Sequence, residues 1–476
     1  MAQWNKNTQD YLDQERSLFE VNMIATKDGN PVDTNNPFPV TGTVGISSET
    51  VVTINPDTNA VDAFGRARVS ELFTLGDYKH LYAIDPNFLD SISGAGSSVT
   101  FLQNQACARL QTGIGTTAFS IHQTKFYHHY QPGKGQLIYT SFNFYAPQRN
   151  ATKRTGYFDE RDGIYFEQVG LNTSDGINPG IGTNNWVIRS FVSGIAIETR
   201  IPQSQWNQDK CDGTGASGFN LDITKTQLAF IDFQWLGVGR VRCGFAHDGQ
   251  LITAHEFNHS NYLDTVYIAN PNLPVRCELR NTGVGIGASF DQICSSVMSE
   301  GGYVESGIDF AYTMTTTRTT PTPAGTELPL VAIRLKNTFQ GYPNRLSVRM
   351  NNLSIFCETN SIVYKVVKLP SDAYLSNAGT LTWTSASTNS GVEVCIDATT
   401  YNDGDVFASG YVPSGASQNS LSPVASGSLT SAKKNIIVQN INSTSSEVYV
   451  IVVRTITTTG NAVANVAAAL QWREIY

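Results

Sequence analysis

Short runs in which apolar and polar residues alternate fill most of this 476-residue chain. Alternation with a period of two is typical of β-strands that bury one face. Clear examples lie at residues 135–145, 163–169 and 228–236. Two further alternating runs flank Asp248-Gly249, and an Asp-Gly pair in that position predicts a β-hairpin. Many short strands at close spacing predict an all-β fold with a jelly-roll-like β-sandwich.

The same pattern divides the chain into three parts. Residues 1–60 are punctuated by Pro, Gly and Asn, with one short amphipathic helix expected within 7–19, and we expect an extended N-terminal arm. Residues 61–364 are predicted to form the sandwich body, with residues 315–324 as a solvent or interface loop. The composition shifts to Ser, Thr, Asn and Ala near residue 365. Residues 365–476 are therefore predicted to form a separate small C-terminal β-sandwich, ending in a strand at 467–475.

Composition narrows the function. Charged residues make up 15% of the chain, below the usual value of about 25%, so we expect neighbouring subunits to cover much of the surface. A net charge of −8 argues against binding to nucleic acid, which requires clustered Lys and Arg. The chain has no apolar run long enough for a signal peptide or a membrane span, so no membrane insertion is expected. The seven scattered cysteines include no C-x-x-C pair and are expected to be reduced core thiols.

One motif carries specific chemistry. His255-Glu256-Phe257-Asn258-His259 fits H-E-x-x-H, in which two histidines one helical turn apart bind zinc. Here the motif ends the second arm of the predicted hairpin, and in a strand the two histidines would lie about 13 Å apart. We therefore expect a strand end with polar and aromatic side chains and no zinc.

Other candidate sites are weaker. The pair His128-His129 can ligate metal only if both rings reach the same side, and a surface or interface role is favoured instead. The acidic, Gly-rich segments 159–163 and 209–218 are loops that either hold calcium or simply form turns. Paired glycosidase carboxylates cannot be identified without knowing which carboxylates meet. The sequence thus predicts no catalytic, cofactor-binding or metal residues, no cofactor and no enzymatic activity.

Several segments carry a family resemblance. Residues 62–82 resemble the start of the body domain in virion structural proteins of tailed phages, especially those of marine cyanobacterial hosts. Further similar segments lie at 17–30, 231–242, 272–276 and 471–474. The resemblance implies a structural subunit of a tail, baseplate, fibre or neck, made in the host cytoplasm and located in the virion. It also implies a homotrimer. The extended, Pro-, Gly- and Asn-punctuated pattern of residues 1–60 predicts that this arm contacts neighbouring virion proteins.

A second class of function fits the same fold. A host-surface glycan-binding or depolymerising tail-spike protein would also use a jelly-roll sandwich, with aromatic side chains such as Trp186, Trp206 and Trp383 exposed to sugar. A groove lined by aromatic side chains and convergent carboxylates would favour this alternative over a purely structural subunit.

Overall fold

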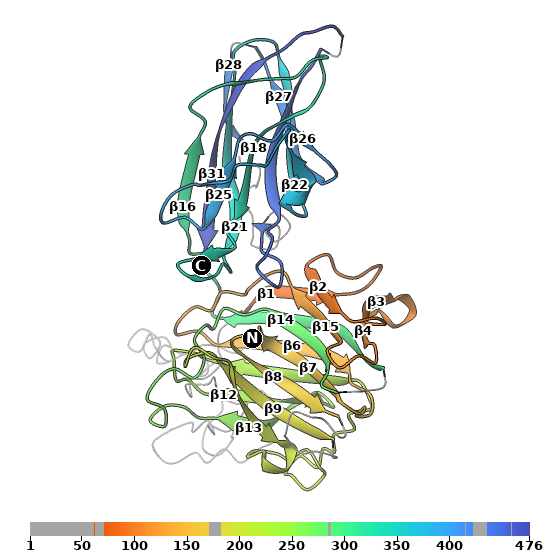
Figure 1. The fold of residues 1–476 in the computed structure, drawn as a ribbon. Coiled ribbons are helices and arrows are strands. Elements are labelled where there is room, and N and C mark those ends of the chain that lie inside the picture. The colour runs from red at the N-terminus through yellow and green to blue at the C-terminus, as the bar shows by residue number, and fades with distance from the viewer. Residues whose placement is uncertain are drawn as a thin grey trace, which may run out of the picture. The chain divides into compact units, whose positions relative to one another are not determined.

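The computed structural model describes residues 61, 71–170, 182–283, 287–414, 416–421, 436–457 and 459–476 (Figure 1). In these residues the chain is all-β, and its helical elements are the 3-10 turns η2 (Gln103–Gln105), η3 (Gln203–Gln205) and η4 (Asp372–Tyr374). The predicted fold class, a jelly-roll-like sandwich followed by a second sandwich, is confirmed. The described part contains no helix long and apolar enough to cross a membrane. The predicted arm at 1–60, with its helix, lies outside the described residues.

The first sandwich, here called the body, consists of two antiparallel sheets. The eight-stranded sheet has the order β13-β12-β11-β6-β15-β4-β3, with β1 paired to the second half of β15. Its strands are β1 (Leu72–Lys79), β3 (Ser98–Leu102), β4 (Cys107–Thr112), β6 (Gln136–Asn143), β11 (Gln227–Phe233), β12 (Val241–His247), β13 (Gln250–Phe257) and β15 (Ala288–Glu300). The hairpin predicted at Asp248-Gly249 is confirmed as β12 and β13.

The seven-stranded sheet of the body has the order β10-β9-β8-β7-β14-β5-β2. Its strands are β2 (Phe88–Ser93), β5 (Phe119–Thr124), β7 (Ala151–Phe158), β8 (Gly163–Val169), β9 (Thr183–Ser190), β10 (Ile197–Pro202) and β14 (Val275–Asn281). The chain crosses between the sheets repeatedly, as a jelly roll requires. Each sheet therefore ends in edge strands from different parts of the sequence, and β13 and β10 are two of them.

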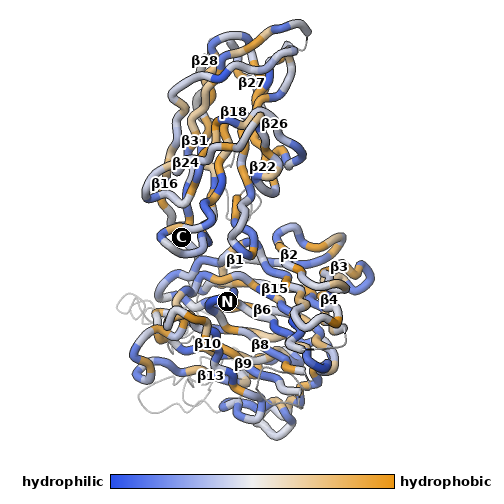
Figure 2. Tube along the Cα trace, viewed as in Figure 1, coloured by the Kyte–Doolittle hydropathy of each residue, from blue (hydrophilic) through white to orange (hydrophobic). Residues whose placement is uncertain are grey.

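Alternation along the strands produces the body core (Figure 2). Ile164 and Phe166 of β8 point inward and are fully buried, together with Ile138 and Phe142 of β6 from the opposite sheet. Burying one such side chain stabilises the fold by about 1.5–3 kcal/mol, so a core of this size holds the two sheets together. On β8 the intervening residues face the other side of the sheet.

The second sandwich packs two six-stranded sheets around a core of its own. One sheet has the order β16-β31-β21-β28, with β17 on β31 and β29 on β21; the other has the order β24-β25-β18-β30-β22-β27. Its strands are β16 (Ile308–Thr313), β17 (Arg318–Thr319), β18 (Leu328–Leu335), β21 (Ser347–Cys357), β22 (Ile362–Leu369), β24 (Thr384–Ser385), β25 (Val392–Cys395), β27 (Asp405–Val412), β28 (Ala416–Leu421), β29 (Ile436–Ile437), β30 (Val448–Thr455) and β31 (Asn465–Ile475). Small hairpins are formed by β19 (Thr338–Phe339) with β20 (Tyr342–Pro343), and by β23 (Leu375–Ser376) with β26 (Thr400–Tyr401).

The strand pairing places the boundary between the two sandwiches earlier in the chain than the sequence predicts. A division between 364 and 365 would cut β22 in two, and β16, β18 and β21 already belong to the sheets of the second sandwich. The second sandwich therefore begins near Ile308. The predicted loop at 315–324 contains β17, and the Arg318 guanidinium donates to the carbonyl of Ala398 at 2.7 Å, so this segment is fastened to its own sandwich.

The last strand is internal to its sheet. β31 pairs with β16 and β17 on one side and with β21 on the other, and Trp472 is fully buried in the core. Only its outward residues, such as Gln471 and Arg473, are left for contacts with another chain. Self-association through this strand stays a prediction. All seven cysteines are free thiols, and Cys294 alone among them is exposed.

Candidate functional site

A groove opens where the edge strands of the two body sheets separate. Its walls come from β9 and β10 of the seven-stranded sheet, from β13 of the eight-stranded sheet, and from the loop that follows β13. Its volume is about 790 Å³. Ligand pockets of this size are commonly concave, mostly apolar and supplied with a few fixed polar groups.

The sequence motif H-E-x-x-H lies in this groove, but it is not a helix. His255 is on β13, and His259 follows the end of the strand. Nδ1 of His255 accepts the backbone N–H of Asn207 at 3.3 Å, while Nδ1 of His259 donates to the carbonyl of Gly239 at 2.8 Å. Each ring is thus fixed by a different backbone group. Burial lowers the pKa of His255 to about 4, and it also lowers the pKa of His259.

Aromatic and aliphatic side chains form the apolar part of the groove. The His259 ring stacks on Tyr267 with a centroid distance of 4.1 Å and an interplanar angle of 9°. Backbone N–H groups of Tyr262 and Leu263 donate to the carbonyl of His259, and this tight turn places both side chains on the rim. Tyr262 is 79% exposed, and Ile197 on the opposite wall is 51% exposed. Exposed apolar side chains therefore stand on opposite walls of the groove.

Polar groups converge on the same groove. Asp264 supplies a carboxylate, and Asn207 and Asn258 supply amides, whereas the Glu256 side chain lies opposite Arg242 in the strand register and faces the outer side of the sheet. Asn207 is held in place because its side-chain amide donates to the Glu256 carbonyl at 2.9 Å and accepts the Glu256 N–H at 2.8 Å. The Glu256 carboxylate lies 3.4 Å from a guanidinium nitrogen of Arg240. The groove therefore combines stacking surfaces with hydrogen-bond acceptors and donors in fixed positions.

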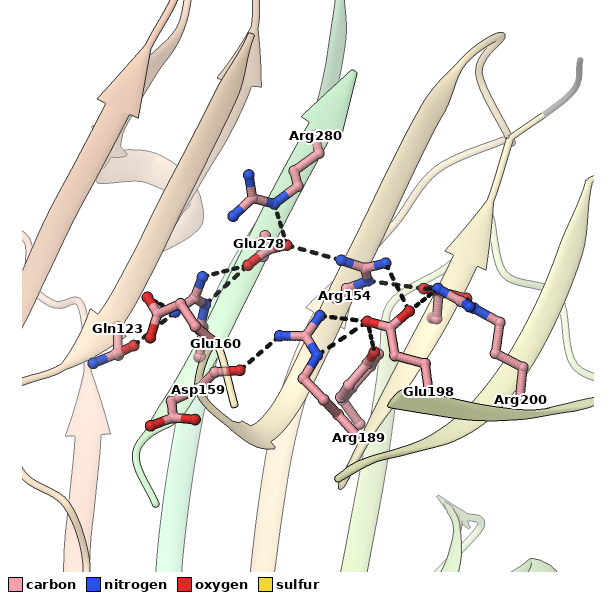
Figure 3. Close-up of polar contacts among 12 residues, drawn as sticks. Gln123, Arg154, Asp159, Glu160, Arg189, Glu198, Arg200, Glu278 and Arg280 are labelled. Atoms are coloured by element: carbon pink, nitrogen blue, oxygen red, sulfur yellow. Dashed lines mark hydrogen bonds and ion pairs between the residues drawn. The ribbon is translucent and has the colours of Figure 1, made fainter. Parts of the chain in front are cut away.

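The outer face of the seven-stranded sheet carries a dense network of ion pairs, here called the charged face (Figure 3). Arg154 on β7 contacts Glu167 on β8 at 2.8 Å and Glu278 on β14 at 3.0 Å. Glu278 also contacts Arg276 and Arg280, each at 2.5 Å. The strand register sets Arg154 directly opposite both Glu167 and Glu278, so these are cross-strand neighbours.

The network continues to the edge strand β10. Glu198 contacts Arg189 on β9 at 2.6 Å and also pairs with Arg200, whose Nε lies 2.8 Å from Glu167. Burial alone raises the pKa of Glu198, but the guanidinium groups of Arg154, Arg189 and Arg200 outweigh it and hold the pKa at about 2. Guanidinium groups likewise hold the pKa of Glu278 well below its usual value, so both of these carboxylates are ionised at neutral pH.

Strand alternation connects the charged face to the groove. On β10, Glu198 and Arg200 face the ion-pair network, whereas Ile197 and Thr199 face the groove. The partners of Ile197 and Thr199 on β9 are Ser190 and Ile188, which also line the groove. The ion pairs thus hold the outside of a strand whose inside forms one groove wall.

In the two acidic loops that are candidates for calcium binding, Asp side chains accept hydrogen bonds from backbone N–H groups of the same loop. In the loop 159–163, Oδ1 of Asp159 accepts the N–H groups of Arg161 and Asp162 at 2.7 and 3.0 Å. In the loop 209–218, Asp209 accepts the N–H groups of Cys211 and Ser217 at 2.8 and 2.9 Å. The bonds from Arg161 and Cys211, two residues after each Asp, are those of Asx turns, and the bond from Ser217 closes the second loop. No group of three or more potential metal ligands occurs among the described residues.

Two expectations for individual aromatic and histidine residues are wrong. Trp186 and Trp206 are buried in the body core, at 0% and 3% exposure, so neither is available to a sugar. Trp383 is partly buried, with the guanidinium of Arg334 4.2 Å from its ring centroid. His128 is also buried, and its Nε2 hydrogen-bonds to the Tyr78 hydroxyl at 2.8 Å, so it has no surface role. An interface role for the pair His128-His129 stays a prediction. Among the residues that line the groove, an exposed aromatic side chain is instead supplied by Tyr262, in a segment that the sequence pattern did not single out.

No known protein family matches the chain, and neither does any curated protein. The sheets of the two sandwiches nevertheless define a β-sandwich protein, and similar solved structures include glycan-binding and glycan-degrading proteins as well as proteins of unknown function. They include a β-1,3-glucanase from Mycobacterium marinum, with 12% identity over 47% of this chain and 98% of that chain and a TM-score of 0.31. The carbohydrate recognition domain of Emp47p has 8% identity over 49% and 100%, with a TM-score of 0.29. Alginate lyase Aly36B has 7% identity over 49% and 100%, with a TM-score of 0.27.

These neighbours correct one prediction. The sequence predicts a protein without enzymatic activity, and this is wrong because the similar structures include a glucanase and an alginate lyase, which are enzymes. The prediction rests on the lack of a recognised local motif. Catalytic groups that come together from distant strands leave no such motif, so that reasoning does not exclude them.

Proposed function

We propose that the body sandwich binds a carbohydrate polymer in the groove between β10, β13 and the loop that follows β13. The observation that carries this proposal is the meeting of exposed Tyr262 with the Asp264 carboxylate and the Asn258 amide in one groove. A pyranose ring has an apolar face that stacks on an aromatic ring, and its hydroxyl groups donate to carboxylates.

The biological setting we propose is a tailed-phage particle that attaches to a host surface. The resemblance of residues 62–82 and 231–242 to phage virion proteins supports this setting. In that setting the groove would contact an envelope polysaccharide, and residues 1–60 would join the subunit to the rest of the particle. A structural subunit of the tail or baseplate is the second candidate, supported by the same segments. Immunogold labelling of particles would locate the protein and test both settings.

The binding test uses the full-length chain and an array of purified polysaccharides that includes the host envelope fraction. We expect binding that Tyr262→Ala weakens at least tenfold, because about 1.4 kcal/mol corresponds to a factor of ten and a stacking aromatic side chain commonly contributes that much. The matched control is Tyr411→Ala, which removes another exposed tyrosine, on β27 of the second sandwich, and should bind like the parent chain.

Incubation of bound polymer with the protein, followed by size-exclusion chromatography, shows whether binding is accompanied by cleavage. A shift to shorter chains would extend the function from binding to depolymerisation. Equal binding by the parent chain and Tyr262→Ala would refute the groove as the site. Lack of binding to every member of the array would refute the function.

A further inference from the structure

β10 is the last strand of the seven-stranded sheet of the body, and β9 is its neighbour in that sheet. Ile197 and Thr199 on this strand are exposed, and Ile195 just before it is 64% exposed. Among the described residues, the backbone of Ile197–Pro202 is hydrogen-bonded to β9 and to the backbone of no other segment. A strand edge of this kind is a template on which a further strand can pair.

The edge strand of the facing sheet, β13, is covered. The backbone N–H groups of Gln208 and Asp209 donate to the carbonyl of Ala254 at 3.1 and 3.2 Å. The side-chain amide of Asn207 bonds both backbone groups of Glu256, at 2.9 and 2.8 Å. Residues 207–209 therefore occupy the edge of β13, whereas no segment in the described part of the chain does the same for β10.

Pro202 shows which backbone groups of β10 point away from β9. In an antiparallel pair every second residue exchanges two hydrogen bonds with its partner, and the residues between them direct their backbone groups to the other side. Pro202 lies opposite Asn185 and has no N–H, so it belongs to the second kind. The register runs along the strand without a bulge, so Glu198 and Arg200 belong to that kind too. Their N–H and C=O groups therefore point outward at the edge of the sheet.

A second copy of β10 can pair with this edge in antiparallel orientation when outward residues face outward residues, and charge then selects the register. With Glu198 opposite Glu198 of the second copy, or Arg200 opposite Arg200, like charges face one another and the pairing is destabilised. With Glu198 opposite Arg200, opposite charges face one another at both ends of the contact. This register places Thr199 opposite Thr199 of the second copy, and Ile197 opposite Ile201.

We propose that the body forms a two-fold dimer in which β10 pairs with β10 of a second copy, centred on Thr199. Glu198 and Arg200 exchange backbone hydrogen bonds across this contact. Their side chains belong to the charged face (Figure 3), so the ion-pair network continues from one chain into the next. Paired threonines are favourable neighbours across antiparallel strands. The contact does not depend on which ligand the groove binds.

The proposed symmetry also sets the relation between the two grooves. A two-fold axis that relates two paired antiparallel strands is perpendicular to their sheet, so the same face of the sheet points the same way in both chains. Ile197 and Thr199 line the groove from that face. The grooves of the two chains therefore lie on one face of the joined sheet.

Sedimentation velocity of the full-length chain measures the contact. We expect a dimer at micromolar concentrations, and Thr199→Lys should weaken it at least tenfold because two lysines then face each other at the axis. Thr199 is exposed, so the circular dichroism of the variant should match that of the parent chain. Thr380→Lys, at an exposed site on the second sandwich, is the matched control and should leave the dimer unchanged.

Further variants test the register. Thr199→Lys and Thr199→Glu should each be monomeric alone and should form a mixed dimer when combined, since opposite charges then meet at the axis. Thr199→Cys should form a disulfide-linked dimer on oxidation, whereas Thr380→Cys should not. The amide hydrogens of Glu198 and Arg200 should exchange at least tenfold more slowly in the parent chain than in Thr199→Lys.

Three results would overturn the proposal. The first is a parent chain that stays monomeric up to about 100 µM. The second is an oligomer of any size that Thr199→Lys leaves equally stable. The third is the failure of the two oppositely charged variants to combine, which would show that Thr199 does not face its own copy.

Discussion

The charged face makes a quantitative prediction about Glu198. This carboxylate lies on β10 with a side-chain exposure of 19%, 2.6 Å from Arg189 and in contact with Arg200. Glu198→Gln keeps the shape of the side chain and removes its charge. Three guanidinium groups then lose a shared partner in a poorly solvated place, and a buried ion-pair network that loses one member is strongly destabilised.

The magnitude follows from the pKa. Burial opposes ionisation of Glu198, but Arg154, Arg189 and Arg200 lower its pKa from 4.5 to about 2. Each pKa unit corresponds to about 1.4 kcal/mol, so the ionised form is stabilised by roughly 3 kcal/mol in the folded state. The glutamine retains part of the hydrogen bonding and the site is partly solvated. We therefore expect the free energy of unfolding to fall by about 2 kcal/mol at pH 7.

Urea unfolding monitored by fluorescence and by amide hydrogen exchange on β9 and β10 would measure this loss. Glu358→Gln serves as the control, since it removes an exposed carboxylate from the second sandwich and should cost less than about 0.5 kcal/mol. The difference between the parent chain and Glu198→Gln should be full above pH 4.5. It should shrink as the pH falls toward 2, because the folded-state pKa is the depressed one. A cost below about 0.5 kcal/mol at pH 7, or one independent of pH between 5 and 3, would refute the reasoning.

Two further buried groups give separate tests. Glu474 is fully buried, accepts the Trp472 indole N–H at 3.0 Å and the Gly391 N–H at 2.9 Å, and contacts the Ser390 hydroxyl. Glu474→Gln places an amide donor among these donors and should lower the free energy of unfolding by about 3 kcal/mol. An unchanged melting temperature in thermal unfolding would contradict this account. Burial lowers the pKa of Lys153 to about 7, so the unfolded chain binds an extra proton between pH 7 and about 10, and stability should rise with pH there by up to about 1.4 kcal/mol per unit. Lys153→Met should abolish that slope in urea titrations at pH 7, 8 and 9, and a slope that persists would contradict it.

The sequence predicts individual strands well because their signal is local. Alternation at 163–169 coincides with β8, and the Asp248-Gly249 turn correctly marks the hairpin of β12 and β13. The domain boundary depends on which strands pair, and this is not local. β16 pairs with β31 although most of the second sandwich separates them in sequence, while the composition shift near 365 falls within β22. Composition follows loops and exposed faces, and it does not report sheet membership.

The candidate site also contains features that a local sequence pattern predicts and features that depend on contacts between distant strands. His255 and His259 attract attention as a motif, and hairpin geometry correctly places His255 on a strand. Their groove depends on β10 meeting β13 across the two sheets, and no local pattern encodes that meeting. Tyr262 is the clearest omission, since a lone exposed tyrosine in a loop has the same local sequence signal whether or not it borders a groove.

The charged face shows what the pairing register between strands adds to the alternation of residues along one strand. The alternation Arg276-Cys277-Glu278-Leu279-Arg280 predicts one charged and one apolar face for a strand. Only the pairing of β14 with β7 brings Arg154 beside Glu278 and makes the charges stabilise one another. β10 carries the last members of this network on one face and forms a groove wall with its other face. The period-two alternation of the strand therefore links the ion pairs to the shape of the groove. A change in the network is therefore expected to alter ligand binding through the position of β10, without any contact between the altered residue and the ligand.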